Sequence, residues 1–368
     1  MPMAIVKKVR KLGLRPGFGT AAREVSAKRP VFVPRSAPCE HGCPNGTDVR
    51  AFLTALAKAN TRHVTADTAL QQAFGVLVER NPLPGVTGRL CPHHCEARCN
   101  REGFDGPVAI NLVERAVAVA ALERRLRLPG PAEPRPERVA VIGAGAAGLS
   151  AAYQLARRGY RVTVFDSHAA PGGELRDPAL WGEAPAVHDP WSPPSLPLLD
   201  AEIARIAALG VQFDCGIARE PDPAIFTRIV RTRVHEGGPV NPGAIPAAIH
   251  YGRHAADSLD ADIRGVATER APKLPPATRE HLKLDRYPAA PRAEERHGGL
   301  TLDEAIAEAK RCLSCGACFE CDNCWKYCPD QAVIKPADAG QPYRFKLEFC
   351  QGCCKCAEEC PCGYIEMA

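Results

Sequence analysis

The chain has 368 residues, of which 45% are apolar and 24% are charged, so it can build two or three domains with packed cores. Its net charge of +5 is too small to indicate nucleic-acid binding. No run of apolar residues approaches the roughly 18 that suggest a membrane span, so none is expected.

The unusual feature of the composition is cysteine, with 18 residues. Five lie between Cys39 and Cys99, and twelve lie between Cys312 and Cys362. The basic N-terminus has no apolar segment of the kind that a secretory signal needs, so we expect a cytoplasmic protein. In that setting, clustered cysteines bind metals more often than they form disulfides. The sequence therefore predicts a metal-binding module towards each end of the chain.

Residues 1–128 are predicted to form an α-helical iron–sulfur domain. Cys39 and Cys43 precede a helix expected over residues 48–58, and a C-x3-C-x3-C run follows. The cysteines of this run are Cys91, Cys95 and Cys99. Five cysteines suffice for one 4Fe-4S cluster but not for two. We therefore expect a single N-terminal cluster.

The centre of the chain, residues 137–265, carries the fingerprint of a dinucleotide-binding Rossmann unit. A strand expected over residues 138–142 leads into a GAGAAG turn and a helix over 146–158. A second strand, over 161–165, ends at an acidic residue. Such glycines let the backbone approach a pyrophosphate, and the acid binds ribose hydroxyls. The candidate dinucleotide-binding residues are Gly143, Gly145, Ala146, Gly148 and Asp166.

Residues 266–311 are expected to be a linker followed by a helix over 302–311. Cys312 and Cys315 come directly after this helix and have the spacing of two metal ligands. A cluster on them would need two further ligands that the sequence does not place, so we interpret them as structural or spare thiols. Cys354 and Cys362 also have no assigned role.

The strongest pattern lies in residues 312–368, where the run C-x2-C-x2-C-x3-C-P occurs twice. This is the bacterial ferredoxin spacing, in which three cysteines of a run hold one cubane and the fourth holds the other. The eight-cysteine pattern disfavours zinc, although single C-x2-C pairs also bind it. One cluster is expected on Cys318, Cys321, Cys324 and Cys360. The second is expected on Cys328, Cys350, Cys353 and Cys356.

The sequence resembles the small subunit of NADPH-dependent glutamate synthase and its flavoprotein relatives, including the sulfite-reductase-linked iron–sulfur flavoprotein. The resemblance rests on GRLCPHHCEARC (88–99), GPVAINLVERAV (106–117), VAVIGAGAAGLSAAYQLARRGYRVTVFD (139–166) and LLDAEIARIAALGVQF (198–213). That family joins an N-terminal iron–sulfur helical domain to an FAD domain interrupted by an inserted NADPH domain. The resemblance thus implies a multidomain α/β protein with a Rossmann-type FAD domain.

The resemblance also implies particular site residues. A family cluster with three cysteines and one carboxylate would be held here by Cys43, Cys91, Cys95 and Glu114. From its residue type alone, Glu114 is a surface charge on a helix expected over residues 107–126. Cys39 and Cys99 match half of a second family cluster, whose upstream cysteine pair is absent. Gly173, in PGGEL, and Gly243, before the helix expected over 244–259, are further cofactor-binding candidates.

The sequence departs from this family in two ways that bear on cofactors. Only about two dozen residues stand where the NADPH domain is inserted, so that domain is missing and the FAD domain is truncated. The family's Gly-Gly-Asp near the flavin reads Gly237-Gly238-Pro239, which removes a hydrogen-bond acceptor. FAD is the expected cofactor, and the alternative is an empty Rossmann scaffold that spaces the clusters.

The C-terminal module, with CWKYCPDQAV (324–333), also resembles the ferredoxin-type delta subunit of 2-oxoacid:ferredoxin oxidoreductases. We therefore predict an electron-transfer subunit with FAD and three 4Fe-4S clusters, not catalytic alone, whose partners are the catalytic subunits of a 2-oxoacid:acceptor oxidoreductase. The alternative is an NAD(P)H-dependent glutamate-synthase-type or sulfite-reductase-linked oxidoreductase subunit. Because the chain has a single GxGxxG turn, we do not expect it to oxidise NAD(P)H itself.

Overall fold

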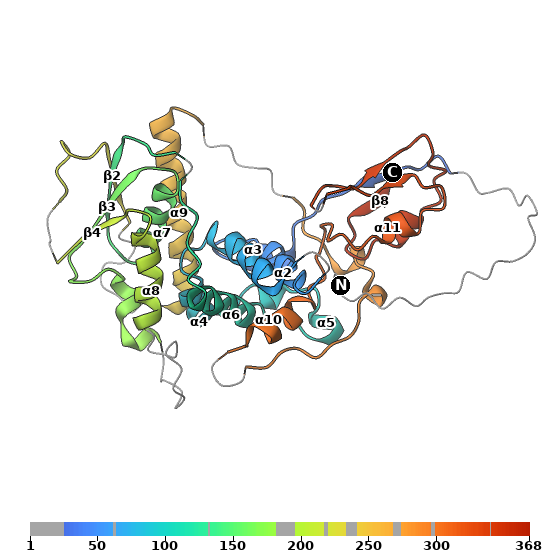
Figure 1. Cartoon of the computed structure of the whole chain (residues 1–368), viewed down its shortest axis with the longest axis horizontal. Coiled ribbons are helices and arrows are strands. Elements are labelled where there is room, and N and C mark those ends of the chain that lie inside the picture. Colours follow the sequence, from blue (N-terminus) through green and yellow to red (C-terminus); the bar gives the residue numbers. More distant parts are fainter. Residues whose placement is uncertain are drawn as a thin grey trace, which may run out of the picture.

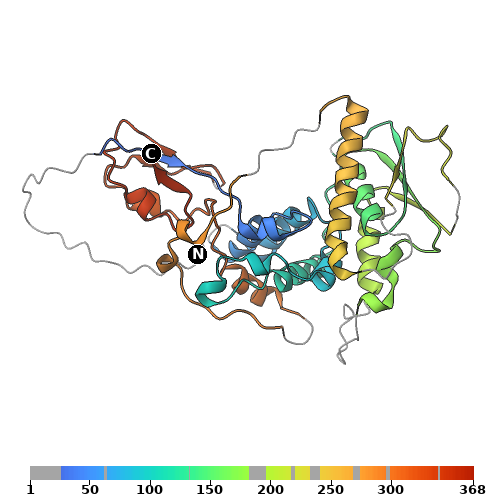
Figure 2. The ribbon, with the colours of Figure 1, turned by 180° about the vertical axis from the view of Figure 1, so that it is seen from behind.

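The computed structural model of the chain has three units that follow one another in space. Figure 1 shows a Rossmann unit at one end, a cysteine-rich C-terminal unit at the other and a helical unit between them, and the view from behind in Figure 2 shows the same order. The structure describes residues 26–61, 64–131, 133–181, 196–216, 220–232, 241–267, 274–295, 299–338 and 340–368. Pro239 lies outside them.

The helical unit is a bundle of amphipathic helices around one apolar core. Asp48 and Thr65 cap its first two long helices by accepting hydrogen bonds from backbone N–H groups. Leu53, Leu70 and Val113 are fully or almost fully buried in the core between the helices. The elements of this unit are α1 (Pro38–Gly42), α2 (Val49–Ala57), α3 (Ala66–Val78), α4 (Pro84–Leu90), η1 (Glu96–Arg98), α5 (Glu102–Asp105) and α6 (Ile110–Glu123).

The Rossmann unit has a four-stranded parallel sheet of order β4-β3-β2-β5. Helix α7, which follows the first strand of this unit, packs closely on the long helix α9. Gly252 of α9 makes this approach possible, since a Cβ there would lie 1.9 Å from the carbonyl oxygen of Ala147. The elements are β2 (Arg138–Ile142), α7 (Ala146–Ala156), β3 (Arg161–Asp166), η2 (Gly173–Arg176), η3 (Pro178–Leu180), α8 (Leu196–Ala207), β4 (Gln212–Cys215), β5 (Arg228–Arg231), η4 (Pro242–Ala244) and α9 (Ile245–Arg264).

The C-terminal unit consists of short strands and single helical turns. One of its two-stranded sheets pairs β1 with β8 in antiparallel fashion, although the two strands come from opposite ends of the chain. Phe32 of β1 stacks on Phe345 and Tyr364 with ring centroids 4.6 and 5.1 Å apart. The elements are β1 (Pro30–Phe32), η5 (Arg279–His281), η6 (Leu284–Arg286), α11 (Asn323–Lys326), β6 (Val333–Ile334), β7 (Arg344–Phe345), α12 (Lys355–Glu358) and β8 (Ile365–Met367).

One C-terminal helix leaves this unit and joins the helical unit. Helix α10 (Leu302–Ala309) packs on α6 and α2, with Ile306 almost fully buried. Thr301 and Glu304 form a capping box at its start, which fixes where the helix begins. The chain therefore returns to the helical unit immediately before Cys312.

The long elements expected from the sequence are present. Helices α2, α7 and α10 and strands β2 and β3 lie within one or two residues of their predicted bounds. Strand β1 was not expected, and it falls in a segment assigned to the helical domain; a strand of three residues has too little periodicity to be recognised.

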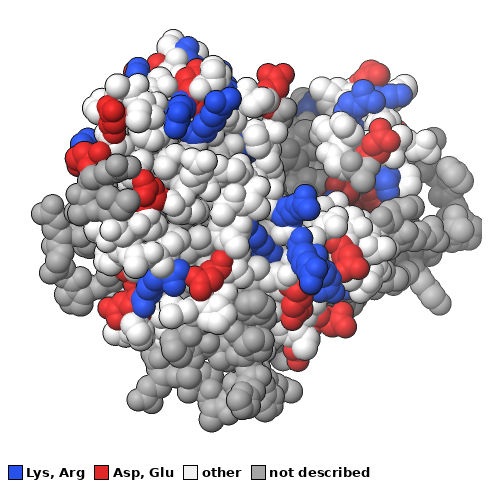
Figure 3. Space-filling model, turned by 60° about the vertical axis from the view of Figure 1, so that its left-hand side comes forward, with Lys and Arg blue, Asp and Glu red and all other residues white. Residues whose placement is uncertain are grey.

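No helix among the residues that the structure describes has the length and apolar character required to cross a bilayer. On the face shown in Figure 3, Lys and Arg are interspersed with Asp and Glu and form no continuous basic stripe.

Candidate metal centres and dinucleotide turn

The first candidate centre lies in the helical unit, between the cysteine-containing turns and α6. Burial, together with the nearby Glu114 carboxyl and Cys43 thiol, raises the pKa of Cys91 to about 12, despite an opposing backbone hydrogen bond from His93. The same two neighbours, after burial, raise the pKa of Cys95. The structure thus brings together the three cysteines and one carboxylate that the family resemblance implied.

Glu114 is a half-buried, hydrogen-bonded carboxyl and not the solvated surface charge that its residue type suggested. Its Oε1 accepts hydrogen bonds from the Thr87 hydroxyl (2.7 Å) and from the Asn81 side-chain amide (3.1 Å). Burial nevertheless raises its pKa to about 7, and no ion pair with it is formed by the residues that the structure describes. A carboxylate that is partly withdrawn from water without a cation is costly, and a metal bound by Glu114 would reduce that cost.

A second candidate centre lies in the C-terminal unit, around a cavity of about 350 Å³. The expected set of Cys318, Cys321, Cys324 and Cys360 lines this cavity. Apolar and aromatic side chains, among them Phe319 and Tyr343, form much of the remaining wall. The backbone N–H of Tyr364 donates to the Cys360 sulfur (3.3 Å), a contact that stabilises a thiolate ligand.

The third candidate centre is formed by the other ferredoxin-type set. Burial, followed by the nearby thiols of Cys350, Cys328 and Cys353, raises the pKa of Cys356 to about 12, although a backbone hydrogen bond from Ala357 opposes the shift. The backbone N–H of Ala332 donates to the Cys328 sulfur (3.2 Å), and that of Gly352 to the Cys350 sulfur (3.4 Å). The crossed arrangement expected from the spacing, with one ligand exchanged between the two runs, therefore appears in both sets.

None of these groups is arranged for a single metal ion. In the described part of the chain, no three His, Cys, Asp or Glu side chains are placed to hold one. A mononuclear zinc site needs four ligands converging at about 2.0–2.3 Å on one point. A cubane instead carries one iron for each thiolate and so fits thiols that surround a larger volume.

The unassigned cysteines have different surroundings. Cys362 lines the same cavity as Cys360, with 3.8 Å between their sulfurs. Cys354 adopts a left-handed conformation (φ 63°) at the start of α12, and its thiol contacts the Gly352 carbonyl. Cys312 and Cys315 line a small pocket together with Cys39 and Cys99.

The dinucleotide turn has the geometry that its sequence predicts. It joins β2 to α7, and a Cβ at Gly148 would lie only 1.7 Å from the Gly143 carbonyl oxygen. Asp166, at the end of β3, accepts hydrogen bonds from the N–H groups of Ala144 (2.6 Å) and His168 (2.8 Å). Although burial opposes the effect, these N–H groups hold the pKa of Asp166 below its usual value.

A second carboxylate, from Glu174 of the PGGEL segment, occupies the phosphate position of this turn. Its Oε1 accepts the N–H of Ala146 at the start of α7 (2.9 Å). A Cβ at Gly145 would lie 2.1 Å from its Oε2, so the carboxylate fills the space that this glycine leaves. A pyrophosphate uses the same N–H group and the same space. The described residues therefore do not fit a bound dinucleotide unless Glu174 moves.

The last two cofactor-binding candidates, Gly173 and Gly243, lie in different parts of the structure. Gly173 has a positive φ of 48°, and a Cβ there would come within 3.0 Å of the Gly145 Cα, so it lies against the turn. Gly243 instead lies near Pro92, which directly follows Cys91. This contact brings the start of α9 to the first candidate centre.

Two family models match parts of the chain. One, described as dihydropyrimidine dehydrogenase domain II, 4Fe-4S cluster, matches residues 14–126. The other, described as an NAD(P)-binding Rossmann-like domain, matches residues 141–193. The chain thus combines a 4Fe-4S-type domain with a Rossmann-like domain that contains a parallel sheet.

Particular relatives are similar over about half of the chain. The beta subunit of NADP(+)-dependent formate dehydrogenase from Moorella thermoacetica is 34% identical over 217 residues, 53% of this chain and 28% of that protein. The PreT subunit of NAD-dependent dihydropyrimidine dehydrogenase from Escherichia coli K12 is 33% identical over 55% of this chain and 45% of its own length. The beta subunit of NADPH-Fe(3+) oxidoreductase from Geobacter sulfurreducens is 31% identical over 50% of this chain and 25% of that protein. The match therefore spans less than half of each relative.

Proposed function

We propose that this chain is an electron-transfer subunit of a multi-subunit oxidoreductase, with its cysteine groups holding 4Fe-4S clusters. The observation that carries the proposal is the assembly of Cys318, Cys321, Cys324 and Cys360, from two separate runs, around one cavity. A 4Fe-4S cluster supplies one-electron transfer at a potential set by its hydrogen bonds and burial. The relatives are named as subunits of oxidoreductases, which supports this general class.

The chain's own residues bind the clusters and control their surroundings. Backbone N–H groups donate to the sulfurs of Cys328, Cys350 and Cys360 at 3.2–3.4 Å, which offsets negative charge on the thiolates. Phe319 and Tyr343 are nearly fully buried beside the C-terminal cavity and limit access of water. No role in bond making or breaking is assigned to any residue.

The C-terminal unit also offers a surface to a partner. Trp325 is 44% exposed, next to Cys324, and Phe349 is 55% exposed, next to Cys350. Lys335 and Lys346 lie over these two rings, so each aromatic side chain is paired with a cation. Exposed aromatic residues are common in protein interfaces. We infer that a catalytic subunit docks here and exchanges electrons with the nearest cluster.

The C-terminal resemblance favours the catalytic subunits of a 2-oxoacid:acceptor oxidoreductase as that partner. The experiment is anaerobic affinity purification of the tagged full chain from its own host, followed by identification of the proteins bound. A 2-oxoacid-oxidising subunit that binds the wild type and is depleted when Trp325→Ala and Phe349→Ala are combined supports the assignment. A different catalytic subunit with the same dependence retains the electron-transfer role and rejects the 2-oxoacid partner.

A second candidate is a subunit that itself accepts electrons from NAD(P)H, as in glutamate-synthase-type or sulfite-reductase-linked oxidoreductases. The observation in its favour is the Rossmann-like match described as NAD(P)-binding. A GxGxxG turn occurs in both FAD and NAD(P) sites, so the match supports either dinucleotide. FAD, when bound, would interconvert two-electron and one-electron transfer. The position of Glu174 favours neither FAD nor NAD(P) and is consistent with the empty scaffold.

A further inference from the structure

We propose that Cys39, Cys99, Cys312 and Cys315 together hold a further 4Fe-4S cluster, which raises the expected number from three to four. The four cysteines line one small pocket whose other walls include Leu53, Val108 and Ile110. All four thiols are free, so none of them is used in a disulfide. The sequence separated two of these cysteines from the other two by more than 200 residues, and the fold brings them together.

The local spacing explains why this group is separate from the one around Glu114. Cys39 and Cys43 lie at opposite ends of the single turn α1. Cys95 and Cys99 likewise flank the single turn η1. The two turns pack against each other, since a Cβ at Gly42 would lie 2.7 Å from the His94 carbonyl oxygen. Each turn therefore gives one cysteine to the Glu114 group and the other to the new group.

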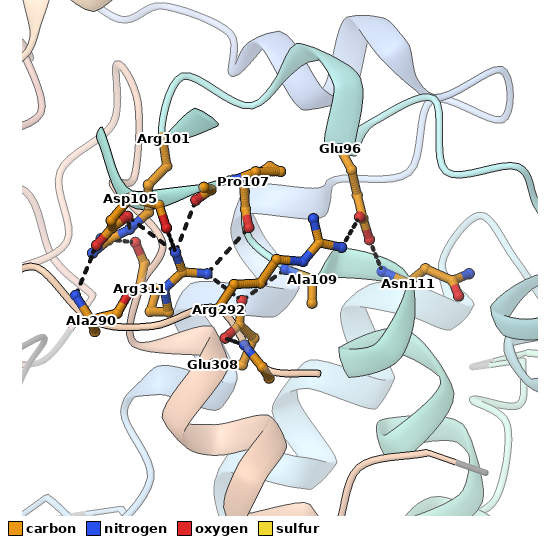
Figure 4. A network of polar contacts seen from close by, with 12 residues as sticks. Glu96, Arg101, Asp105, Pro107, Ala109, Asn111, Ala290, Arg292, Glu308 and Arg311 are labelled. Carbon is orange, nitrogen blue, oxygen red and sulfur yellow. Dashed lines mark hydrogen bonds and ion pairs between the residues drawn. The ribbon is translucent and has the colours of Figure 1, made fainter. Parts of the chain in front are cut away.

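A buried polar network joins the segment that ends at Arg311, directly before Cys312, to the segment that follows Cys99 (Figure 4). The Arg101 guanidinium donates to the Arg311 carbonyl oxygen, and Arg311 donates to the Asp105 carbonyl and carboxylate. Glu308 of α10 accepts from Arg311 (2.6 Å) and from the N–H of Ala109 (2.8 Å). Arg101 and Arg311 are 1% and 4% exposed. This network lies directly beside Cys99 and Cys312 in sequence and fixes one against the other.

The surroundings of the four thiols suit a 4Fe-4S cluster, which is bound by thiolates. Apolar side chains enclose the four thiols, and thiolates in such a setting need compensating positive charge. The N–H of Ser314 donates to the Cys312 sulfur (3.4 Å), and the Asn100 side-chain amide donates to the Cys315 sulfur (3.5 Å). On binding, each thiol releases its proton to solvent and forms one Fe–S bond.

The position of this cluster gives it a place in the proposed electron path, a role that rests on the proposed function. Cys315 is three residues from Cys318, and Arg50 lines both pockets. Tyr287 is nearly fully buried, and its hydroxyl donates to the Leu313 carbonyl oxygen (2.7 Å), between Cys312 and Cys315 in sequence. The new cluster would thus lie between the Glu114 centre and the C-terminal centres and connect them.

The test is an iron and sulfide count on the full chain, purified anaerobically after reconstitution with iron and sulfide. We expect about sixteen irons in the wild type and about twelve in Cys312→Ala, since a cubane holds four. Cys39→Ala should lose the same four irons, and the double variant should still contain about twelve. Cys215→Ala, which changes a cysteine in β4 of the Rossmann unit, is the matched control and should keep about sixteen.

Three results would overturn the site. They are about twelve irons in the wild type with no loss in Cys312→Ala, about eight in the double variant, and zinc in place of the lost iron. If a single variant fails to fold, the electron paramagnetic resonance spectrum of the dithionite-reduced wild type still decides, because four spin systems are expected and three would contradict the site. The count needs no partner, so its failure would leave the proposed function standing.

Discussion

At the scale of single residues, the chemistry of the helical unit depends on Glu114. It lies on α6, is half-buried, and accepts hydrogen bonds at Oε1 from two neutral donors of the described chain. Hydroxyl and amide donors orient a carboxylate without neutralising it, so Oε2 is left to a cation. The cysteines that share the site are Cys43, Cys91 and Cys95.

The first prediction is that Glu114→Ala removes the Glu114-centred cluster and leaves the others intact. About four irons should be lost, because three thiolates without a fourth ligand hold a cubane weakly. Thr68→Ala, which changes an exposed hydroxyl on α3, is a control that should lose none. An unchanged iron content in Glu114→Ala would show that its carboxylate orients the site without ligating iron.

Glu174 is the second residue of this kind, because its carboxylate bears on whether the GxGxxG turn can bind a dinucleotide. Its carboxylate takes the Ala146 N–H and the space beside Gly145 where a pyrophosphate would bind. An anion already in this position competes with any dinucleotide for the same donors.

The second prediction is that Glu174→Ala increases the amount of FAD bound per chain, measured by acid release after incubation with FAD. The substitution removes the competing charge and opens space next to Gly145. Gly145→Val, which fills that space, is the matched variant and should bind none. About one FAD per chain in both the wild type and Glu174→Ala would mean that Glu174 does not block the turn and that the empty-scaffold alternative is wrong. No FAD in either protein would contradict the prediction and support the empty scaffold.

At the scale of elements, one buried carboxyl joins the Rossmann unit to the helical unit. Glu202 of α8 accepts the N–H groups of Gly85 (2.7 Å) and Val86 (3.1 Å) at the start of α4, the helix that ends next to Cys91. Burial outweighs these hydrogen bonds and the nearby Arg205 and Arg89, and raises the pKa of Glu202 to about 7. The junction between α8 and α4 is therefore sensitive to pH.

The third prediction is a loss of stability as pH rises through the range between the two pKa values of Glu202. The folded chain keeps a proton to about pH 7 that the unfolded chain releases near its ordinary pKa of 4.5. The free energy of unfolding should fall by about 3 kcal/mol over that window, at about 1.4 kcal/mol per pKa unit. Glu202→Gln should lack this decrease. Parallel thermal-unfolding profiles of the two proteins between about pH 5 and pH 8 would contradict the prediction.

The long elements of the fold could be predicted from the sequence because their signals are local. Helix α7 follows a GAGAAG turn, and α10 begins at a Thr-x-x-Glu capping box. The grouping of Cys360 with the first C-terminal run was also expected, because the doubled C-x2-C-x2-C-x3-C spacing predicts it. The meeting of Cys39 with Cys312 could not be predicted, since it depends on Arg101 and Arg311 binding each other's segments across about half of the chain. Glu174 was missed because only the folded turn shows which side chain fills it.

At the scale of the whole molecule, the cysteine groups form a series through two of the three units. The turn η4, directly before α9, lies close to Pro92, the residue that follows Cys91 of the Glu114 centre. From there the candidate centres continue through the helical unit to the C-terminal unit, where exposed aromatic residues lie beside the last cysteines. This order, visible in Figure 1 as one line of units, is what an electron path from one end to a partner at the other requires.

The most direct test of this account is an anaerobic reductive titration of the purified full chain, followed by its visible absorbance. We predict that dithionite bleaches the iron–sulfur absorbance, while NADH and NADPH cause no rapid bleaching, because the single GxGxxG turn cannot hold both a flavin and a nicotinamide. Rapid bleaching by either NADH or NADPH would contradict the account of a chain that receives its electrons from a partner subunit.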